Sequence, residues 1–384
     1  MKQNQKRRQL TQEEKLARGP IDLPFLLIAM LLLGFGLVML LSASSASSYY
    51  ESGNAMTYFI KQAIFAVAGV AVMFVVSKID YQSFRGLSVI VLGAAIFFLV
   101  VVLLPIPGFS MRINGARRWL NLGITNFQPS ELAKLGVILY FSARISKMKE
   151  KITEWRNLVP FAVILALIVI LMYFEPHMSG TILILIAGIT LLFVGGLKLK
   201  WVLLGGGGMA AILLFIITQT SYMTSRLQHW LNPWSDPQGK GYQTIQSLYA
   251  IGSGGFLGLG LGKSRQKFLY LPEEHNDFIF AVVCEELGYV GGAIVLILFA
   301  LLVLRGYWLA IHARDRFGSL LIVGVTTLLA AQVFLNICVV TNFLPATGIS
   351  LPFFSYGGTA LFLQLFEIGI VLSVSRQIPA PRSG

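Results

Sequence analysis

The sequence contains few charged residues, few cysteines and few histidines. Asp, Glu, Lys and Arg together account for 12% of its 384 residues, whereas hydrophobic residues account for 56%. With a mean hydropathy of +0.74, this composition excludes a soluble enzyme and indicates a polytopic membrane protein. The two cysteines lie in apolar runs, where we expect small fillers rather than a disulfide, and the four histidines show no metal-ligand spacing.

Apolar stretches of about 17–25 residues, each long enough to cross a bilayer, recur along the chain. They predict an all-α fold with about ten transmembrane helices in one membrane domain over residues 21–376, and no internal repeat is visible between its halves. The fourth span is unusual because Glu131 and Lys134 lie in its first turn. The expected spans are 24–45, 57–77, 86–104, 131–147, 158–174, 178–196, 201–218, 277–303, 318–341 and 355–376.

Basic residues are distributed unevenly between the expected loops. If the N-terminus is cytoplasmic, most Lys and Arg fall on the cytoplasmic side, as the positive-inside rule requires, and residues 1–20 and 377–384 are cytoplasmic tails. The first apolar run precedes a SASSASS patch that resembles a signal-peptidase site. At about twenty residues this run is too long for a signal sequence, so we expect an uncleaved anchor. Anionic lipid headgroups explain the net charge of +13 without any nucleic acid.

Two of the outer connections are long and polar, and long loops in a compact bundle usually carry function. They cover residues 105–130 and residues 219–276, the second between the seventh and eighth spans. Basic residues kept outside against the topological bias indicate an anionic partner, for which phosphate is the natural candidate, although a solvated loop or a headgroup contact is the alternative. The basic residues concerned form two clusters: Arg112, Arg117 and Arg118, and Lys263, Arg265 and Lys267.

The second loop ends in a polar run, LYLPEEHNDFIF (269–280), that meets the eighth span. Asp277 is the last acidic residue before this span, and His275 lies two residues earlier. A carboxylate at such a rim is partly desolvated, so it can act as a base on a lipid-anchored substrate. The alternative is an acidic first turn favoured by the helix dipole. Deeper in the same span, we expect Glu285 and Glu286 to make buried polar contacts between helices, with a functional role as the alternative.

Other polar residues of the loops are weaker candidates. Gln243 and Gln246 offer neutral donors suited to hydroxyl and amide groups, and Glu131 and Lys134, three residues apart, could pair on one helix face. The glycine-rich run 252–262 lacks the context of a nucleotide site. We expect it to pack closely against other backbone or to form a re-entrant element.

Four segments resemble the SEDS family, whose members (RodA, FtsW and SpoVE) serve shape, elongation, division and sporulation. In the family's order, they are NGARRWLNLG (114–123), QPSELAKL (128–135), GYQTIQSLYAIGSGGFLGLGLGKSRQKFLYLPEEHNDFIFAVVCEELG (241–288) and PATGISLPFFSYGGTAL (345–361). The resemblance implies a ten-helix glycosyltransferase of the bacterial cytoplasmic membrane that polymerises lipid II into peptidoglycan glycan strands. It also implies a class B penicillin-binding protein as the transpeptidase partner.

The resemblance places the family's essential aspartate on Asp277. This residue would remove the proton from the acceptor GlcNAc 4-hydroxyl as the oxygen attacks C1 of the donor MurNAc, which gives an inverted β-1,4 link. The two basic clusters would neutralise the leaving pyrophosphate, alone or with a divalent cation such as Mg or Mn. Further binding candidates are Glu131, Lys134, Gln243, Gln246 and His275.

One segment departs from the family, because FEPHMSGT (174–181) has His177 where many relatives carry an aspartate. This departure puts in doubt a catalytic role for that position. The segments NGARRWLNLG and ATGISLPFFSYGG resemble division and sporulation members more than elongation members. We therefore expect synthesis of a division or sporulation septum, with elongation as the alternative.

Two rival functions use the same ligand without the chemistry. A lipid II flippase would need polar residues that are accessible from the cytoplasmic half; Glu175, His177, Glu285 and Glu286 keep that function open. The one-sided polar loops and the lack of a visible repeat argue against it. A scaffold that only recruits the penicillin-binding protein would need neither Asp277 nor the basic loops.

Overall fold

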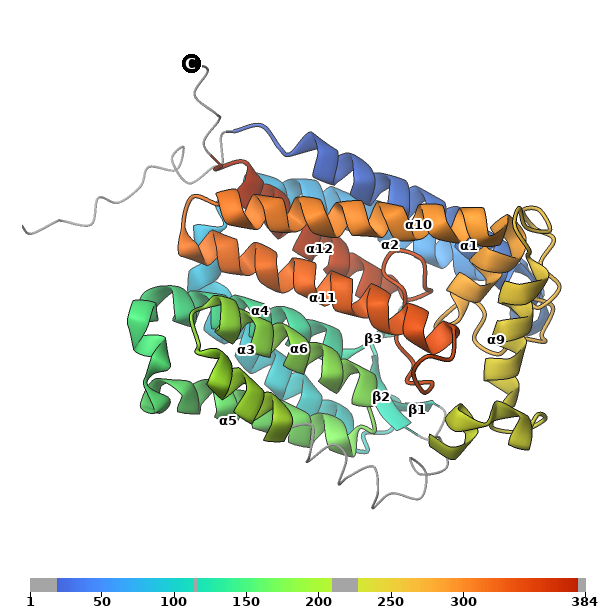
Figure 1. The fold of residues 1–384 in the computed structure, drawn as a ribbon, viewed down its shortest axis with the longest axis horizontal. Helices are drawn as coiled ribbons and strands as arrows, with labels where there is room; N and C mark the ends of the chain where they lie inside the picture. Colours follow the sequence, from blue (N-terminus) through green and yellow to red (C-terminus); the bar gives the residue numbers. More distant parts are fainter. Residues whose placement is uncertain (1–18, 114–115, 124, 209–226, 379–384) are drawn as a thin grey trace, which may run out of the picture.

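A computed structural model describes residues 19–113, 116–123, 125–208 and 227–378. Within these ranges the chain forms an elongated bundle of helices with one small sheet at one end (Figure 1). Seven of the described helices are long and apolar enough to cross a membrane. The prediction of an all-α polytopic membrane protein is confirmed.

The described residues contain nine of the ten expected spans in full. They are α1 (Leu23–Ser52), α2 (Thr57–Lys78), α3 (Gln82–Leu103), α4 (Pro129–Met148), α5 (Trp155–Phe174), α6 (Met178–Val194), α10 (Ile279–His312), α11 (Arg316–Val340) and α12 (Gly358–Ser375). For the expected span 201–218, residues 199–208 are helical and the remainder lies outside the described residues.

Helix α1 runs further than the apolar run that predicted it. It continues through the SASSASS patch (42–48) and ends at Ser52. Two serine hydroxyls along this stretch bond back to helix carbonyls, Ser45 to Ser42 O at 2.9 Å and Ser52 to Ser48 O at 2.7 Å. Such bonds satisfy the hydroxyl groups inside a helix. Ser47 and Ser48 are buried, so the patch packs inside the protein.

The two long loops contain structure that the sequence analysis did not predict. Strands β1 (Ser110–Ile113), β2 (Ala116–Asn121) and β3 (Asn126–Phe127) form an antiparallel sheet in the order β1-β2-β3. In the second loop, helix α9 (Tyr242–Ser253) lies across the end of the bundle (Figure 1). Short 3-10 turns at Lys149–Thr153 and Pro233–Ser235 complete the described elements.

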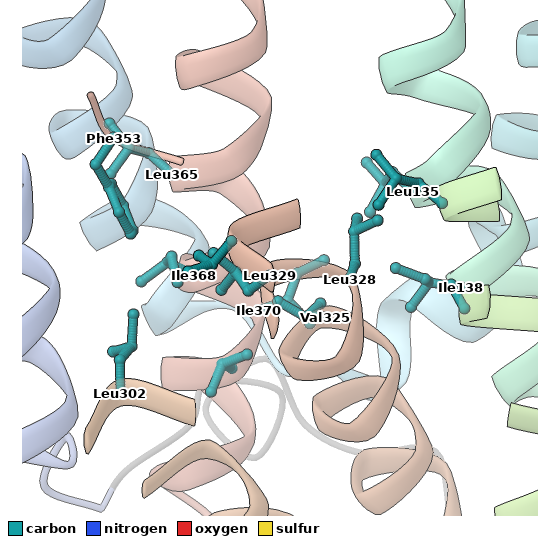
Figure 2. Close-up of a cluster of buried hydrophobic side chains, with 14 of the residues drawn as sticks. Leu135, Ile138, Leu302, Val325, Leu328, Leu329, Phe353, Leu365, Ile368 and Ile370 are labelled. Carbon is teal, nitrogen blue, oxygen red and sulfur yellow. The ribbon is translucent and has the colours of Figure 1, made fainter. Parts of the chain in front are cut away.

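The core of the bundle surrounds α11, most of whose residues are buried. Side chains from α4, α10, α11 and α12 meet there in a cluster that includes Leu135, Leu302, Leu328 and Ile368 (Figure 2). Helix α11 approaches α4 closely at Gly324, where a Cβ would lie 2.7 Å from Ile138. Small residues at a crossing let two membrane helices pack tightly.

The two ends of the bundle differ in what they carry. At one end, which we call the tail end, the start and the end of the described chain lie together, with Arg376 Nε 2.8 Å from Gly19 O and Arg305 paired with Asp22 at 2.5 Å. The opposite end, which we call the loop end, holds the sheet, α9 and the approach to α10 (Figure 1). The helices therefore bring both predicted functional loops to the same end.

Candidate functional site

Asp277 lies at the loop end, half-buried in the turn that precedes α10. The backbone of this turn is fixed, because the carbonyl groups of residues 275–277 each accept a hydrogen bond from α11 or from the connection between α11 and α12. The donors are the Tyr356 N–H (2.9 Å), the Ser355 hydroxyl (2.7 Å) and the Asn336 side-chain amide (2.7 Å). Three bonds in succession fix the direction in which the side chains of the turn leave the backbone.

Asn336 and Gly348 place the Asp277 carboxylate against one particular segment. Asn336 is fully buried on α11, and its amide nitrogen also donates to Ile349 O at 2.6 Å. A Cβ on Gly348, which has φ +72°, would lie 3.2 Å from Asp277 Oδ2. Glycine adopts this backbone conformation without strain and lets the chain approach the carboxylate closely. The carboxylate therefore lies beside the ATGIS part of the 345–361 segment.

His275 anchors the other side of the turn in an aromatic cluster. Its ring stacks on Tyr58 of α2 at 4.9 Å between centroids and meets Tyr356 edge-on at 6.0 Å. Its Nδ1 lies 3.5 Å from a carboxylate oxygen of Glu274, which is buried and accepts a hydrogen bond from the Ser47 hydroxyl of α1. These contacts fix His275 against the bundle, two residues before Asp277 in the same turn.

The two predicted loops meet at the start of α12. The Ser355 hydroxyl bonds the Asp277 turn, and four residues later the Thr359 hydroxyl donates to Asn126 O of β3 at 3.0 Å. Gln62 of α2 holds this junction, since its amide bonds Ser355 O at 3.2 Å and the Gly357 N–H at 3.1 Å. The sheet of the first loop and the turn of the second are therefore bound to the same short segment.

The first basic cluster lies on the sheet. Arg112 and Arg117 are backbone partners on β1 and β2, and Arg117 is half-buried; nothing of the Arg112 side chain lies within the described part. Arg118 is half-buried and donates from Nε to Glu175 O at 3.2 Å, and its guanidinium also bonds Pro176 O. These contacts tie the cluster to the turn between α5 and α6.

That turn holds residues of the FEPHMSGT segment (174–181). Glu175 is fully buried, and within the described residues neither oxygen of its carboxyl group has a hydrogen-bond partner. Burial raises the pKa of Glu175 to about 8, although the nearby Arg118 charge opposes the rise. Burial, together with Arg118 and Lys134, lowers the pKa of His177 to about 3. At pH 7 both side chains are therefore mainly neutral.

The first turn of α4 carries an ion pair that the sequence analysis allowed. Lys134, 3% exposed, lies 2.7 Å from Glu131, three residues earlier on the same helix. Glu367, buried on α12, interacts electrostatically with both. The pair therefore lies between α4 and α12, and its role in substrate binding stays a prediction.

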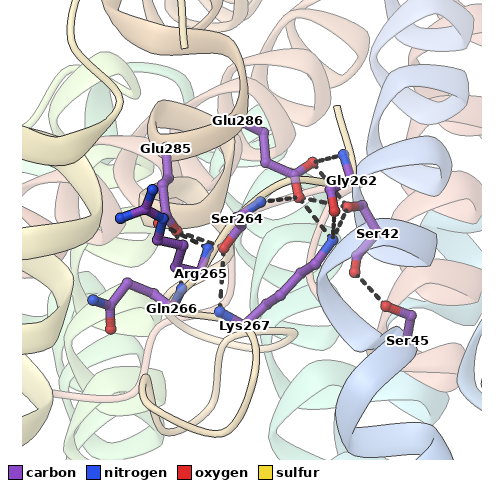
Figure 3. A network of polar contacts seen from close by, with 9 residues as sticks. All are labelled: Ser42, Ser45, Gly262, Ser264, Arg265, Gln266, Lys267, Glu285 and Glu286. Carbon is purple, nitrogen blue, oxygen red and sulfur yellow. Dashed lines mark hydrogen bonds and ion pairs between the residues drawn. The ribbon is translucent and has the colours of Figure 1, made fainter. Parts of the chain in front are cut away.

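The second basic cluster is divided between the surface and the interior. Lys263 and Arg265 are exposed, whereas Lys267 is buried. Its ammonium group lies 3.0 Å from Glu286, 3.0 Å from the Ser42 hydroxyl and 2.7 Å from Gly262 O (Figure 3). The expectation that Lys267 meets an outside ligand does not fit this position, because its donors already have partners inside the protein.

The two glutamines lie on α9, beside the chain that leads to Asp277. Gln243 donates to Pro272 O at 3.3 Å, and Gln246 is half-buried. Helix α9 is itself fixed to the end of α11, since the Ser247 hydroxyl donates to Val340 O at 2.8 Å. Within the described ranges, no group of three or more His, Cys, Asp or Glu is arranged as a metal site.

Known proteins are similar to this chain over most of its length. The family model described as "Cell cycle protein", which covers FtsW, RodA and SpoVE, matches residues 23–379. The chain belongs to this family. Among curated members of the FtsW/RodA/SpoVE family, stage V sporulation protein E of Bacillus subtilis is 41% identical over 358 residues, which is 92% of this chain and 97% of the relative. A probable peptidoglycan glycosyltransferase FtsW of Geobacter sulfurreducens is 38% identical, with 93% and 95% covered.

Solved structures of the FtsW/RodA/SpoVE family share the fold. A chain from a peptidoglycan synthase complex, described as coordinating polymerization and crosslinking, superposes with a TM-score of 0.77 at 29% identity, with 93% of this chain and 98% of that chain covered. The rod shape determining protein RodA of Thermus thermophilus superposes with a TM-score of 0.70 at 27% identity, with 94% and 98% covered. The resemblance read from the four sequence segments is confirmed.

The sequence analysis missed three polar residues of the spans that support the site. Asn336 holds the Asp277 turn, Gln62 holds the junction at Ser355, and Glu367 lies beside the Lys134 ion pair. The signal was present, because an uncharged or acidic polar residue inside an apolar span is costly unless it has a partner. The hydrogen-bond partners of Asn336 and Gln62, however, lie 13 to 295 residues away in sequence. The pattern of polar and apolar residues does not indicate such distant partners.

Proposed function

We propose that this protein is a peptidoglycan glycosyltransferase that polymerises lipid II into β-1,4 glycan strands for a division or sporulation septum. It acts at the outer face of the bacterial cytoplasmic membrane. Both termini are cytoplasmic, with residues 1–20 and 377–384 as tails, and the loop end faces outward. Family membership and the names of the relatives support this proposal.

The observation that carries the proposal is the fixed turn around Asp277. A general base must be held within hydrogen-bond reach of the proton that it removes, and a displacement of about 1 Å can cost a hundredfold in rate. The bonds from Asn336, Ser355 and Tyr356 supply this rigidity. A half-buried carboxylate at the start of a membrane span also suits a sugar whose lipid anchor lies in the bilayer.

The reaction can be assigned to residues of this end. Asp277 takes the proton of the acceptor GlcNAc 4-hydroxyl while the oxygen forms a bond to C1 of the donor MurNAc. The bond from C1 to the pyrophosphate oxygen breaks, and the polyprenyl pyrophosphate leaves with the electron pair. Arg117 and Arg118 on the sheet and Lys263 and Arg265 on the second loop are the cations that can offset its charge.

The partner in this proposal is a class B penicillin-binding protein that cross-links the new strands. The solved relative with the highest TM-score quoted above comes from a complex that joins polymerization and crosslinking. A polymerase that works with a transpeptidase delivers its product to the same face of the membrane. The outward loop end provides that arrangement.

The test is polymerisation of labelled lipid II by the purified full-length protein, with and without its class B partner. We expect strands from the wild type and none from Asp277→Ala. If neither protein makes strands but the wild type moves lipid II across liposomes, the protein is a flippase instead. Lipid II binding without strands or movement, with or without the partner, would also overturn the proposal.

A further inference from the structure

The glycine-rich segment of the second loop is inserted into α10. In an unbroken α-helix the carbonyls of residues 285 and 286 accept from the N–H groups of residues 289 and 290. Here Leu259 and Gly260 donate to these carbonyls, at 3.0 and 2.9 Å, while the N–H groups of residues 289 and 290 donate to the carbonyls of residues 255 and 256. Helix α10 is interrupted at Gly288, which has φ +68° and ψ −171°.

Only glycine fits at this crossing. A Cβ on Gly288 would overlap the backbone of Gly258 and Phe256, and a Cβ on Gly258 would overlap the Glu286 carbonyl. The backbone hydrogen bonds that the interruption would leave open are taken up by the inserted segment. Irregular backbone is tolerated in a membrane protein where the protein itself satisfies it. The first part of α10, which follows Asp277, is thus joined to the glycine-rich segment.

Glu286 bonds the backbone N–H groups of the two residues that flank Lys263. Its carboxylate, which is fully buried, accepts from the Gly262 N–H at 2.9 Å and from the Ser264 N–H at 3.2 Å (Figure 3). It also meets Lys267 at 3.0 Å and the Ser42 hydroxyl of α1 at 2.7 Å. One carboxylate therefore joins the loop, α10 and α1.

Glu285 fixes the next part of the loop. Its carboxylate is also fully buried, and it accepts from the Arg265 N–H at 2.9 Å, from the Gln266 N–H at 3.3 Å and from the Ser264 hydroxyl at 2.5 Å. All of these donors belong to the loop. The side chains of Lys263 and Arg265 are exposed, although the neighbouring backbone is hydrogen-bonded to the two buried carboxylates.

Such an arrangement is expensive for a loop that only connects two helices. Burying a carboxylate costs several kcal/mol unless donors surround it, and a polar surface loop needs no buried charge for its stability. Glu285 and Glu286 bond the backbone that carries two exposed cations. The cost of burying both carboxylates is explained if these cations must be held in fixed positions.

We propose that Glu285 and Glu286 are positioning residues, which hold the backbone of residues 259–267 so that Lys263 and Arg265 present a fixed pair of positive charges to the pyrophosphate group of a lipid. This inference rests on the proposed function. Preorganised charges bind an anion more tightly than mobile ones because less conformational freedom is lost on binding. The same bonds connect these charges rigidly to the chain that carries Asp277.

The first experiment measures binding of undecaprenyl pyrophosphate to the full-length protein in nanodiscs, together with hydrogen–deuterium exchange. We expect Glu285→Gln to weaken binding about tenfold and to speed exchange within residues 259–267 only. Ser264→Ala, which changes no charge, should act in the same direction with a smaller effect. The matched control is Glu154→Gln, which replaces an exposed carboxylate at the tail end and should change neither readout.

A double-mutant cycle separates positioning from general support of the fold. Arg265→Gln should weaken pyrophosphate binding in the wild type, but much less in the Glu285→Gln background, where the backbone of residue 265 is no longer fixed. Additive effects, or faster exchange with unchanged affinity, would overturn the proposal. Glycan synthesis does not enter these readouts. A protein that binds the pyrophosphate lipid by this cycle but makes no strands would refute the polymerase proposal alone.

Discussion

Two sets of acidic residues at the loop end are equally buried and yet differ in their surroundings. Glu285 and Glu286 are fully buried, and their carboxylates accept hydrogen bonds from a backbone loop, from serines and, for Glu286, from Lys267. Glu175 is also fully buried, but among the described residues its carboxyl oxygens have no donor. Burial raises its pKa to about 8. The comparison shows that partners, rather than depth, decide what a buried acid does.

The difference has a functional counterpart. The bonded pair holds the loop that carries Lys263 and Arg265 and joins it to the chain leading to Asp277. Glu175 is neutral at pH 7 and lies beside Arg118, whose guanidinium bonds the carbonyls of the same turn. A neutral Glu175 leaves the positive charge of Arg118 uncompensated by this residue. The bonded pair therefore holds the backbone under two exposed cations, whereas the Arg118 side chain is itself bonded to the backbone of the turn between α5 and α6.

Of the three changes considered, removing the charge of Glu286 should destabilise the protein most, because Glu286 belongs to the hydrogen-bonded pair of buried acids. Glu286→Gln leaves Lys267 buried without its counter-ion, and breaking a buried pair from one side costs about 3–5 kcal/mol. We expect a large fall in melting temperature in detergent. The double variant Glu286→Gln/Lys267→Met should regain much of it, because it no longer contains an unpaired buried charge. Equal melting temperatures for the wild type and the single variant would contradict this account.

A side chain at the interruption of α10 should weaken the contact between α10 and the glycine-rich segment without changing any charge. Gly288→Ala forces a left-handed φ on alanine and overlaps the Gly258 backbone, and strain of this kind costs about 1–3 kcal/mol. Faster hydrogen exchange in the 255–260 segment is expected. Gly252→Ala is the control, because no atom lies within 4 Å of its Cβ position. Similar exchange in the two variants would show that the close approach does not matter.

Glu175, the buried acid without hydrogen-bond donors among the described residues, should make stability depend on pH, with a smaller effect than the two changes above. The raised pKa means that folded Glu175 keeps its proton between pH 4.5 and about 8, whereas the unfolded chain loses it, so wild-type stability falls as pH rises through this window. Glu175→Gln has no proton to lose. The difference in melting temperature, variant minus wild type, should therefore increase from pH 5 to pH 8 and remain constant above pH 8. A difference that is the same at pH 5 and at pH 8 would refute the assignment.

The sequence alone was sufficient for the features that depend on composition and local spacing. Apolar runs predicted the spans, and the i,i+3 spacing allowed the Glu131–Lys134 pair that the structure contains. The sheet was missed although Asn114-Gly115 between short polar-apolar runs is a known hairpin signal. Strands as short as these, outside the apolar spans, carry too few residues for a clear alternating pattern.

Other features could not be predicted because they depend on distant partners. The insertion of the glycine-rich segment at Gly288 pairs residues that are about thirty positions apart in two different elements, and apolar periodicity continues across the interruption. Lys267 looked equivalent to Lys263 and Arg265 in the sequence. Its burial follows from Glu286 and from Ser42 of α1, 225 residues away, which no local pattern indicates.

The most direct test of the account is the rate of lipid II polymerisation by Asp277→Asn, compared with Glu273→Gln in the same turn and with the class B partner present. A general base contributes ~10²–10⁴-fold, so we predict that Asp277→Asn loses at least a hundredfold in rate while it still binds lipid II. Glu273→Gln should retain its rate. Strand synthesis at the wild-type rate by Asp277→Asn would contradict the central claim that the fixed turn serves to hold a catalytic base.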